Sequence, residues 1–149
     1  MERIERTVAI NAPIEKVFHF HDDTKNLLKI TPPNIHVTIE TMGQPGLGYE
    51  VTLKIRQFLV FVMRWKVKIT AYQPPRLMVD EQIRGPFKFW KQTRLINEVN
   101  GVTELTDIVE YEAPFGILGR IANALLIRRQ VEQMFTYRQA TTKRLLESM

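Results

Sequence analysis

Residues 87–112, FKFWKQTRLINEVNGVTELTDIVEYE, contain two runs of strand-forming residues joined by the pair Asn100-Gly101. Asn-Gly is the strongest signal for a two-residue β-hairpin turn, because both turn residues must adopt positive φ angles. The stretch therefore predicts two antiparallel strands, at residues 87–99 and 102–112, in a register that the turn fixes.

This register places Trp90 opposite Tyr111 and Arg94 opposite Asp107. Gln92 shares their face, so that an apolar wall would carry a small polar cluster. A buried arginine needs a partner, and Asp107 would supply one in planar, bidentate geometry. Two interpretations follow. The pair is an internal salt bridge, or Arg94 and Gln92 orient the polar end of an otherwise hydrophobic ligand.

Alternation of apolar and polar residues continues toward the N-terminus. It predicts further strands at residues 2–10, 35–40, 49–57, 59–71 and 76–84. In the fourth of these, the odd positions are large and apolar, so one face is buried. Met63, Trp65 and Val67 are expected on the cavity wall, since adaptable methionine and flat aromatic surfaces suit irregular apolar ligands. In the fifth, the odd positions are assigned to the inner face, where Glu81 could approach the polar cluster.

Helices complete the pattern. Asn11 and Pro13 predict the start of a short helix with Asn11 as its cap, and Thr24 caps a second short helix. Residues 117–147 have helical apolar spacing, which includes Leu125, and predict one long helix. An α+β fold follows, in which a seven-stranded curved antiparallel sheet and the long helix enclose a hydrophobic cavity.

The composition excludes several classes of enzyme. A chain of 149 residues without cysteine predicts a single domain, residues 1–149, with no disulfide and no thiolate chemistry. Ser148 is the lone serine and lies one residue from the C-terminus, which excludes a serine-hydrolase mechanism. His19 and His21 point to different faces of a helix, so no metal site is expected. No phosphate-binding glycine motif occurs, and no cofactor is expected.

The net charge is +5, but the basic residues are scattered and not interleaved with aromatic ones, so no nucleic-acid partner is expected. No secretory signal or membrane-spanning stretch is recognisable, which predicts a soluble, cytoplasmic protein, monomeric or homodimeric. Residues 58–62, FLVFV, form an apolar run. This run is an entrance lip, a dimer contact or a site of transient membrane contact, or else it packs under the loop at residues 43–48.

Two phrases carry a family resemblance. The first is INAPIEKVF at residues 10–18, followed by an aspartate at position 22 or 23. The second is GPFKFW at residues 85–90, which continues through TDIVEY at 106–111 to APFG at 113–116. Over nearly the whole chain the sequence resembles the START-like (SRPBCC) superfamily, including its polyketide cyclase/dehydrase-like and ligand-binding members. The resemblance implies a helix-grip fold around a hydrophobic ligand cavity.

The chain departs from those relatives in one strand. Where their strand often reads W-x-H-x-H, this chain has Trp90, Gln92 and Arg94. Loss of both histidines removes a source of proton chemistry and favours binding over catalysis.

Three functions are therefore weighed. The leading one is binding or transport of a lipid, an isoprenoid or quinone, or an aromatic polyketide-like compound. The second is a cyclase/dehydrase-type enzyme, and the third is a module that contacts a membrane surface or another protein. The catalytic candidates for the second are Arg94, Asp107, Glu81 and Tyr111. The expected ligand-binding residues are Met63, Trp65, Val67, Glu81, Trp90, Gln92, Arg94, Asp107, Tyr111 and Leu125.

Overall fold

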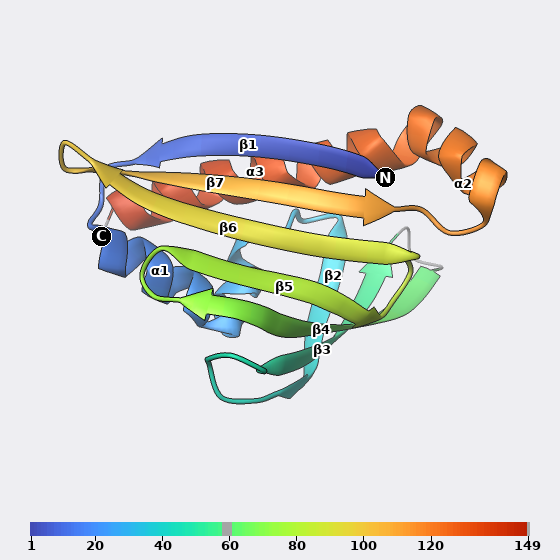
Figure 1. Ribbon diagram of the computed structural model, residues 1–149, viewed down its shortest axis with the longest axis horizontal. Helices are drawn as coiled ribbons and strands as arrows, with labels where there is room; N and C mark the ends of the chain where they lie inside the picture. Colours follow the sequence, from blue (N-terminus) through green and yellow to red (C-terminus); the bar gives the residue numbers. More distant parts are fainter. Residues whose placement is uncertain (58–60, 149) are drawn as a thin grey trace.

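A computed structural model describes residues 1–57 and 61–148 of the chain. Its elements follow the predicted order of one strand, two short helices, six strands and a C-terminal helical segment (Figure 1). The strands are β1 (Glu2–Ile10), β2 (Ile35–Met42), β3 (Glu50–Gln57), β4 (Phe61–Gln73), β5 (Leu77–Arg84), β6 (Phe89–Val99) and β7 (Val102–Glu112). The helices are α1 (Ile14–Asp22), η1 (Thr24–Ile30), α2 (Gly116–Ala122), η2 (Asn123–Ile127) and α3 (Arg128–Glu147).

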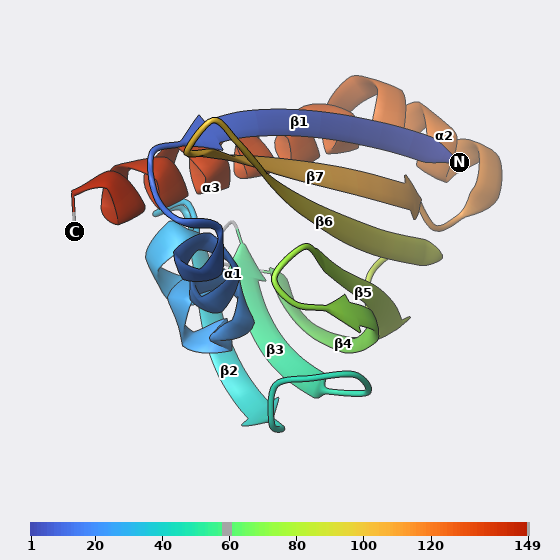
Figure 2. The same cartoon turned by 60° about the vertical axis from the view of Figure 1, so that its left-hand side comes forward.

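The strands form one antiparallel sheet in the order β1-β7-β6-β5-β4-β3-β2. Trp90 pairs with Tyr111 and Arg94 pairs with Asp107, which confirms the register set by the Asn-Gly turn. The sheet curls strongly, so that β2 and β3 cross the direction of β1 while α3 runs alongside β1 (Figures 1 and 2). This arrangement confirms the predicted helix-grip fold.

Local irregularities accompany the curl. The pairing of β4 with β5 shifts register between Lys66 and Val67 and again between Ile69 and Ala71. Such bulges bend a strand and increase its twist. They let the sheet turn far enough to leave a concave face opposite α3.

The predicted helix caps are wrong in both short helices. Pro13 occupies the cap position of α1 and no side chain caps it, while the backbone N–H of Asn11 donates to the Glu147 carboxylate at 2.7 Å. In η1, a 3₁₀ helix, the Asp23 carboxylate accepts from the Lys25 N–H at 3.1 Å. Thr24 instead shares a hydrogen bond of 2.6 Å with the Tyr49 hydroxyl.

The C-terminal helical segment is less regular than predicted. It has a π-helical turn, η2, between α2 and α3. At this turn Asn123 is buried, and its Oδ1 accepts a hydrogen bond of 2.6 Å from the Tyr111 hydroxyl. In α3 the buried apolar residues include Val131, Phe135 and Leu146. Among the described helices, none is both long and apolar enough to cross a lipid bilayer.

Candidate functional site

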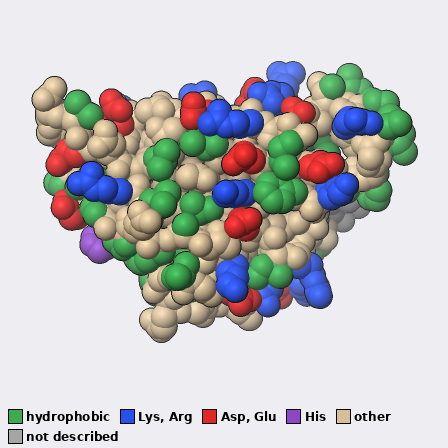
Figure 3. All heavy atoms as spheres, in the orientation of Figure 1, with side chains coloured by type: hydrophobic (Ala, Val, Ile, Leu, Met, Phe, Trp, Pro, Cys, Tyr) green, Lys and Arg blue, Asp and Glu red, His purple; other side chains and the backbone are tan. Residues whose placement is uncertain are grey.

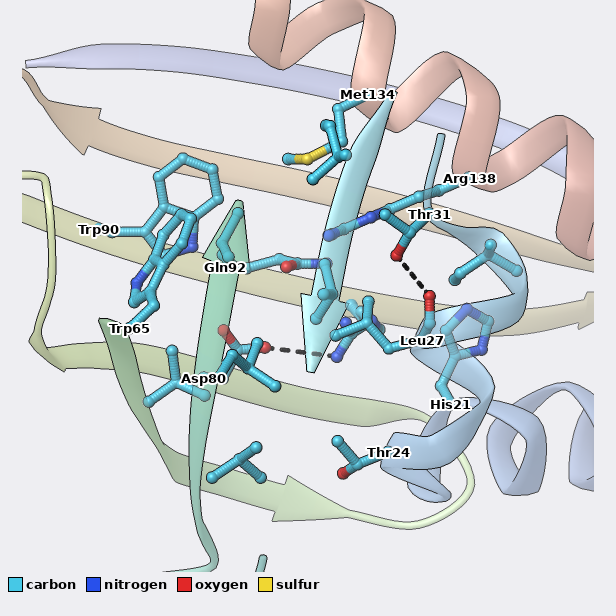
Figure 4. A pocket seen from close by; sticks show the side chains of 18 of the residues that line it. His21, Thr24, Leu27, Thr31, Trp65, Asp80, Trp90, Gln92, Met134 and Arg138 are labelled. Atoms are coloured by element: carbon cyan, nitrogen blue, oxygen red, sulfur yellow. Dashed lines mark hydrogen bonds and ion pairs between the residues drawn. The ribbon is translucent and has the colours of Figure 1, made fainter. Parts of the chain in front are cut away.

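A cavity of about 360 Å³ lies between the concave face of the sheet, the α1–η1 segment and α3 (Figure 4). Its walls are mostly apolar. The apolar side chains include Leu27, Ile35, Val37, Val51, Leu53, Ile55, Met63, Val67, Ile69, Ile127, Val131 and Met134. Trp65, Phe87 and Trp90 pack against one another at one end, with ring centroids 4.9–5.6 Å apart.

A charged cluster interrupts this apolar wall. Arg94 Nη1 donates to Asp80 Oδ2 at 3.3 Å, and Arg94 Nε lies 3.9 Å from Asp107 Oδ1. Asp107 lies behind the wall, where it accepts hydrogen bonds from Gln92 at 3.2 Å and from Gln139 at 2.9 Å. Burial raises the pKa of Asp80, and the positive charge of Arg94 opposes that shift. The bidentate pair of Arg94 with Asp107 expected from the sequence is therefore wrong, because Arg94 hydrogen-bonds to the carboxylate of Asp80 instead and is only near that of Asp107.

Arg138 is a second cation on the cavity wall, and it is bound differently. It points from α3 into the cavity (Figure 4), and its guanidinium lies over the Phe135 ring at 5.2 Å from the centroid. Its buried Nε has no hydrogen-bond acceptor within residues 1–57 and 61–148. Burial, and then the neighbouring Arg94, lower the pKa of Arg138 to about 10, so it stays charged at neutral pH. This cation is therefore positioned to receive an oxygen atom of a ligand.

Trp65 provides another donor of the same kind. Its indole Nε1 is buried on the cavity wall and lacks an acceptor in the described part of the chain. A buried polar hydrogen without an acceptor costs about 1–3 kcal/mol. Trp65 and Arg138, both on the cavity wall, therefore each carry a buried N–H without a described acceptor.

His21, from α1, also lines the cavity. Its Nδ1 lies 2.9 Å from the Val17 carbonyl oxygen, and since a carbonyl can only accept, Nδ1 carries the hydrogen. Burial, and then the charge of Arg94, lower the pKa of His21 to about 4. The imidazole is therefore neutral at pH 7, and Nε2 has a lone pair available.

Most of the predicted wall residues do line the cavity. They are Met63, Trp65, Val67, Trp90, Gln92 and Arg94. Their roles in binding remain predictions. Asp107 is buried one step behind them, beneath Gln92 and Gln139.

Three of the predicted positions are wrong. Met78 pairs with Arg94 and Asp80 pairs with Gln92, so the even residues of β5 face inward and Glu81 does not line the cavity. Tyr111 is fully buried within the core rather than on the wall. Leu125, in the π-helical turn η2, is 77% exposed and does not line the cavity.

The sequence interpretation missed His21, Asp80 and Arg138. His21 lies four residues after the buried Val17, on the same face of α1, and this spacing could have identified it. Arg138 follows the buried Phe135 by three residues on α3, which is a similar signal. Asp80 was missed because the inner face of β5 was assigned to the odd positions.

The apolar run at residues 58–62 falls largely outside the described residues. Val62, which is described, is 48% exposed. The interpretation of this run as a lip or contact surface stays a prediction.

Comparisons with known proteins bear on the family. Residues 1–147 match the protein family described as polyketide cyclase/dehydrase and lipid transport. No curated protein matches the chain. Protein CV1439 from Chromobacterium violaceum is similar in structure, with a TM-score of 0.79, 13% identity and coverage of 99% of each chain.

Two further solved structures have the same architecture. The Zhui aromatase/cyclase from Streptomyces sp. R1128 has a TM-score of 0.73 at 19% identity, covering 98% of this chain and 93% of that one. The protein TTHA0849 from Thermus thermophilus has a TM-score of 0.74 at 16% identity, covering 95% of this chain and 97% of that one. At such identities, structural likeness shows the fold alone. The match over residues 1–147 shows more: this chain belongs to the polyketide cyclase/dehydrase and lipid transport family of the START-like superfamily.

Proposed function

We propose that residues 1–149 form a single domain that binds a hydrophobic small molecule with one oxygen-bearing polar end. The observation that carries this proposal is Arg138, a cation without a described acceptor for its Nε on a mostly apolar cavity wall. A mostly apolar pocket with a few convergent polar groups is the usual architecture of a small-molecule site. A lipid, an isoprenoid or quinone, and an aromatic polyketide-like compound all fit this description.

The two parts of the cavity would divide the work of recognition. Apolar burial contributes about 0.8 kcal/mol per methylene group, so the Val, Leu, Ile and Met walls would provide most of the affinity. The oxygen of a carbonyl, phenol or carboxylate would accept hydrogen bonds from Arg138, which fixes the orientation of the molecule. Arg94 is less suited to this role, because Asp80 and Asp107 already surround it.

Native mass spectrometry of protein purified from its host, followed by extraction of any small molecule, tests the proposal. Arg138→Met removes the charge and keeps an apolar side chain on the wall. Arg129→Met is the matched control, because Arg129 lies on the same helix and is exposed. The proposal predicts a stoichiometric apolar adduct in wild type and Arg129→Met, and at least a tenfold lower occupancy in Arg138→Met at equal folding. Empty wild-type protein, or equal occupancy in both variants, would contradict it.

The proposal extends to the setting of the protein. As a carrier it would act in the cytoplasm, as a monomer or homodimer and without a nucleic-acid partner. A chain with no cysteine fits a reducing compartment. Subcellular fractionation of the host and light scattering of the purified protein test these points.

One observation favours a second candidate function, a cyclase-type reaction. His21 lines the cavity, where its Nε2 lone pair could accept a proton from a substrate near two arginines that could stabilise the oxygen of an enolate, and its pKa of about 4 would make it a weak base. This role replaces the one assigned to Glu81 and Tyr111, which lie outside the cavity. A poly-β-ketone thioester, followed by ultraviolet absorbance, would show an aromatic product in wild type and at least a hundredfold slower formation in His21→Phe. No product with wild type would contradict this function.

A further inference from the structure

Large apolar side chains crowd the outer surface of α2 and η2. Figure 3 shows hydrophobic side chains gathered at the end of the molecule where Figure 1 places α2. The exposed residues, called here the α2 patch, are Phe115 (83%), Ile117 (65%), Leu118 (73%), Ile121 (52%), Leu125 (77%) and Leu126 (54%). Single exposed apolar residues are ordinary, whereas a contiguous group of this kind marks a contact surface.

The backbone holds the α2 patch outward. Gly119 is buried on the inner side of α2, against the carbonyl group of Pro114, and this close approach leaves no room for a side chain. Phe115 has a φ of 69°, in the left-handed region that bulky residues rarely adopt. Its carbonyl oxygen accepts the Gly119 N–H at 3.4 Å at the start of α2, and its ring is exposed. The backbone therefore fixes Phe115 at the start of α2 with its ring directed away from the core.

Charge around the patch is one-sided. Residues 113–131 contain three arginines and no aspartate or glutamate. Arg120 and Arg129 are exposed there, whereas Arg128 forms ion pairs with Glu2 and Glu132. A basic apolar helix surface matches an anionic lipid surface, where each arginine contributes about 1 kcal/mol near the headgroups.

The same charge argues against a second copy of the chain as the occupant. In a symmetric dimer the patch would face itself, and Arg120 and Arg129 would be brought close to their own counterparts. Like charges placed together across an interface oppose association. An anionic bilayer meets no such penalty.

Residues next to the patch in the chain belong to the cavity wall. Pro114 and Ile127, which flank it in the chain, both line the cavity, as does Gln130 in the first turn of α3. A lipid surface in contact with α2 would therefore lie next to one end of the cavity. We propose that the α2 patch docks the protein on anionic membranes, with Phe115, Leu118 and Leu125 inserted among the lipids. This docking stands independently of which molecule the cavity holds.

Co-sedimentation with vesicles tests the docking. Wild-type protein is expected to bind vesicles of phosphatidylcholine and phosphatidylglycerol, more weakly at high salt, and to bind pure phosphatidylcholine least. Leu118→Asp with Leu125→Asp changes only exposed positions and is expected to lower the partition coefficient about tenfold or more. Leu47→Asp is the matched control, because Leu47 is also 73% exposed but lies away from α2. Circular dichroism and thermal melting confirm that all variants fold.

Several results would overturn the docking. They are a wild-type protein that fails to bind the anionic vesicles, a double variant that binds as well as wild type, and an equal loss in Leu47→Asp. A wild-type dimer that the double variant dissociates, seen by light scattering, would assign the patch to a second copy instead. Arg138→Met, which alters only the cavity, is expected to bind vesicles like wild type, so failure of ligand binding and failure of docking remain distinguishable.

Discussion

Replacing Asp107 by asparagine tests whether the charged cluster stabilises the fold. The asparagine has the same shape, and one oxygen can still accept from Gln92, but an N–H₂ group now faces the Gln139 side chain that donates to Asp107 at 2.9 Å. Arg94 also loses one of its two carboxylate neighbours. Breaking a buried charge pair costs about 3–5 kcal/mol and leaving a donor unpaired about 1–3 kcal/mol. Because Gln139 keeps its second acceptor, the Arg6 carbonyl, we expect a loss of about 3 kcal/mol in the free energy of unfolding.

Chemical denaturation and thermal melting measure this loss. A loss of about 3 kcal/mol corresponds to a decrease in Tm of about 10 °C for a chain of this size. Glu104→Gln is the control, because Glu104 is an exposed residue of the same strand, and its change is expected to stay within about 0.5 kcal/mol. Equal melting temperatures for the two variants would refute the reasoning.

Three further changes have expected outcomes. The pKa of His21 is lowered to about 4, below the unfolded value of 6.5, so the unfolded chain binds this proton more readily. The contribution of neutral His21 to the free energy of unfolding is therefore full above pH 6.5 and is lost as the pH falls toward 4. Allowing for partial exposure of His21, the free energy of unfolding of wild type is expected to fall by about 2 kcal/mol more than that of His21→Phe between pH 7 and 4.5. Parallel curves of unfolding free energy against pH for the two proteins would contradict this. Tyr111→Phe leaves the buried Asn123 Oδ1 without its donor and is expected to cost about 1–3 kcal/mol in urea denaturation, so a cost under about 0.5 kcal/mol would contradict the contact. Alanine in place of glycine normally stabilises a helix by about 1 kcal/mol. Gly119→Ala is nevertheless expected to lower Tm, because its Cβ would collide with the Pro114 carbonyl. An unchanged or higher Tm would contradict that packing.

Local signals in the sequence were sufficient where geometry is set by neighbouring residues. The Asn100-Gly101 turn determines its own loop length, so the pairing of Arg94 with Asp107 could be predicted residue by residue. Strong alternation likewise placed Met63 and Trp65 on the inner face of β4. In β5 the alternation is weaker and a bulge shifts its pairing with β4 beside Ile69, so the inner face was assigned to the wrong residues.

The missing parts of the site depend on contacts between distant segments. His21 and Arg138 reach the cavity only because α1 and α3 pack against the curved sheet, and strand alternation carries no information about that packing. The apolar spacing of the C-terminal segment correctly indicated a helix, but its pattern alone could not distinguish burial in the core from exposure. Leu118 and Leu125 have this helical spacing and are exposed, while Val131 and Phe135 have it and are buried.

A crystal structure of the protein with the molecule extracted from it tests the proposed binding function most directly. We expect density inside the cavity between Trp65 and Arg138, with an oxygen atom of the ligand within about 3.5 Å of the Arg138 guanidinium and the apolar remainder along β3 and β4. A molecule bound outside the cavity would contradict the proposed function. A ligand inside the cavity whose polar end points away from Arg138 would contradict it as well.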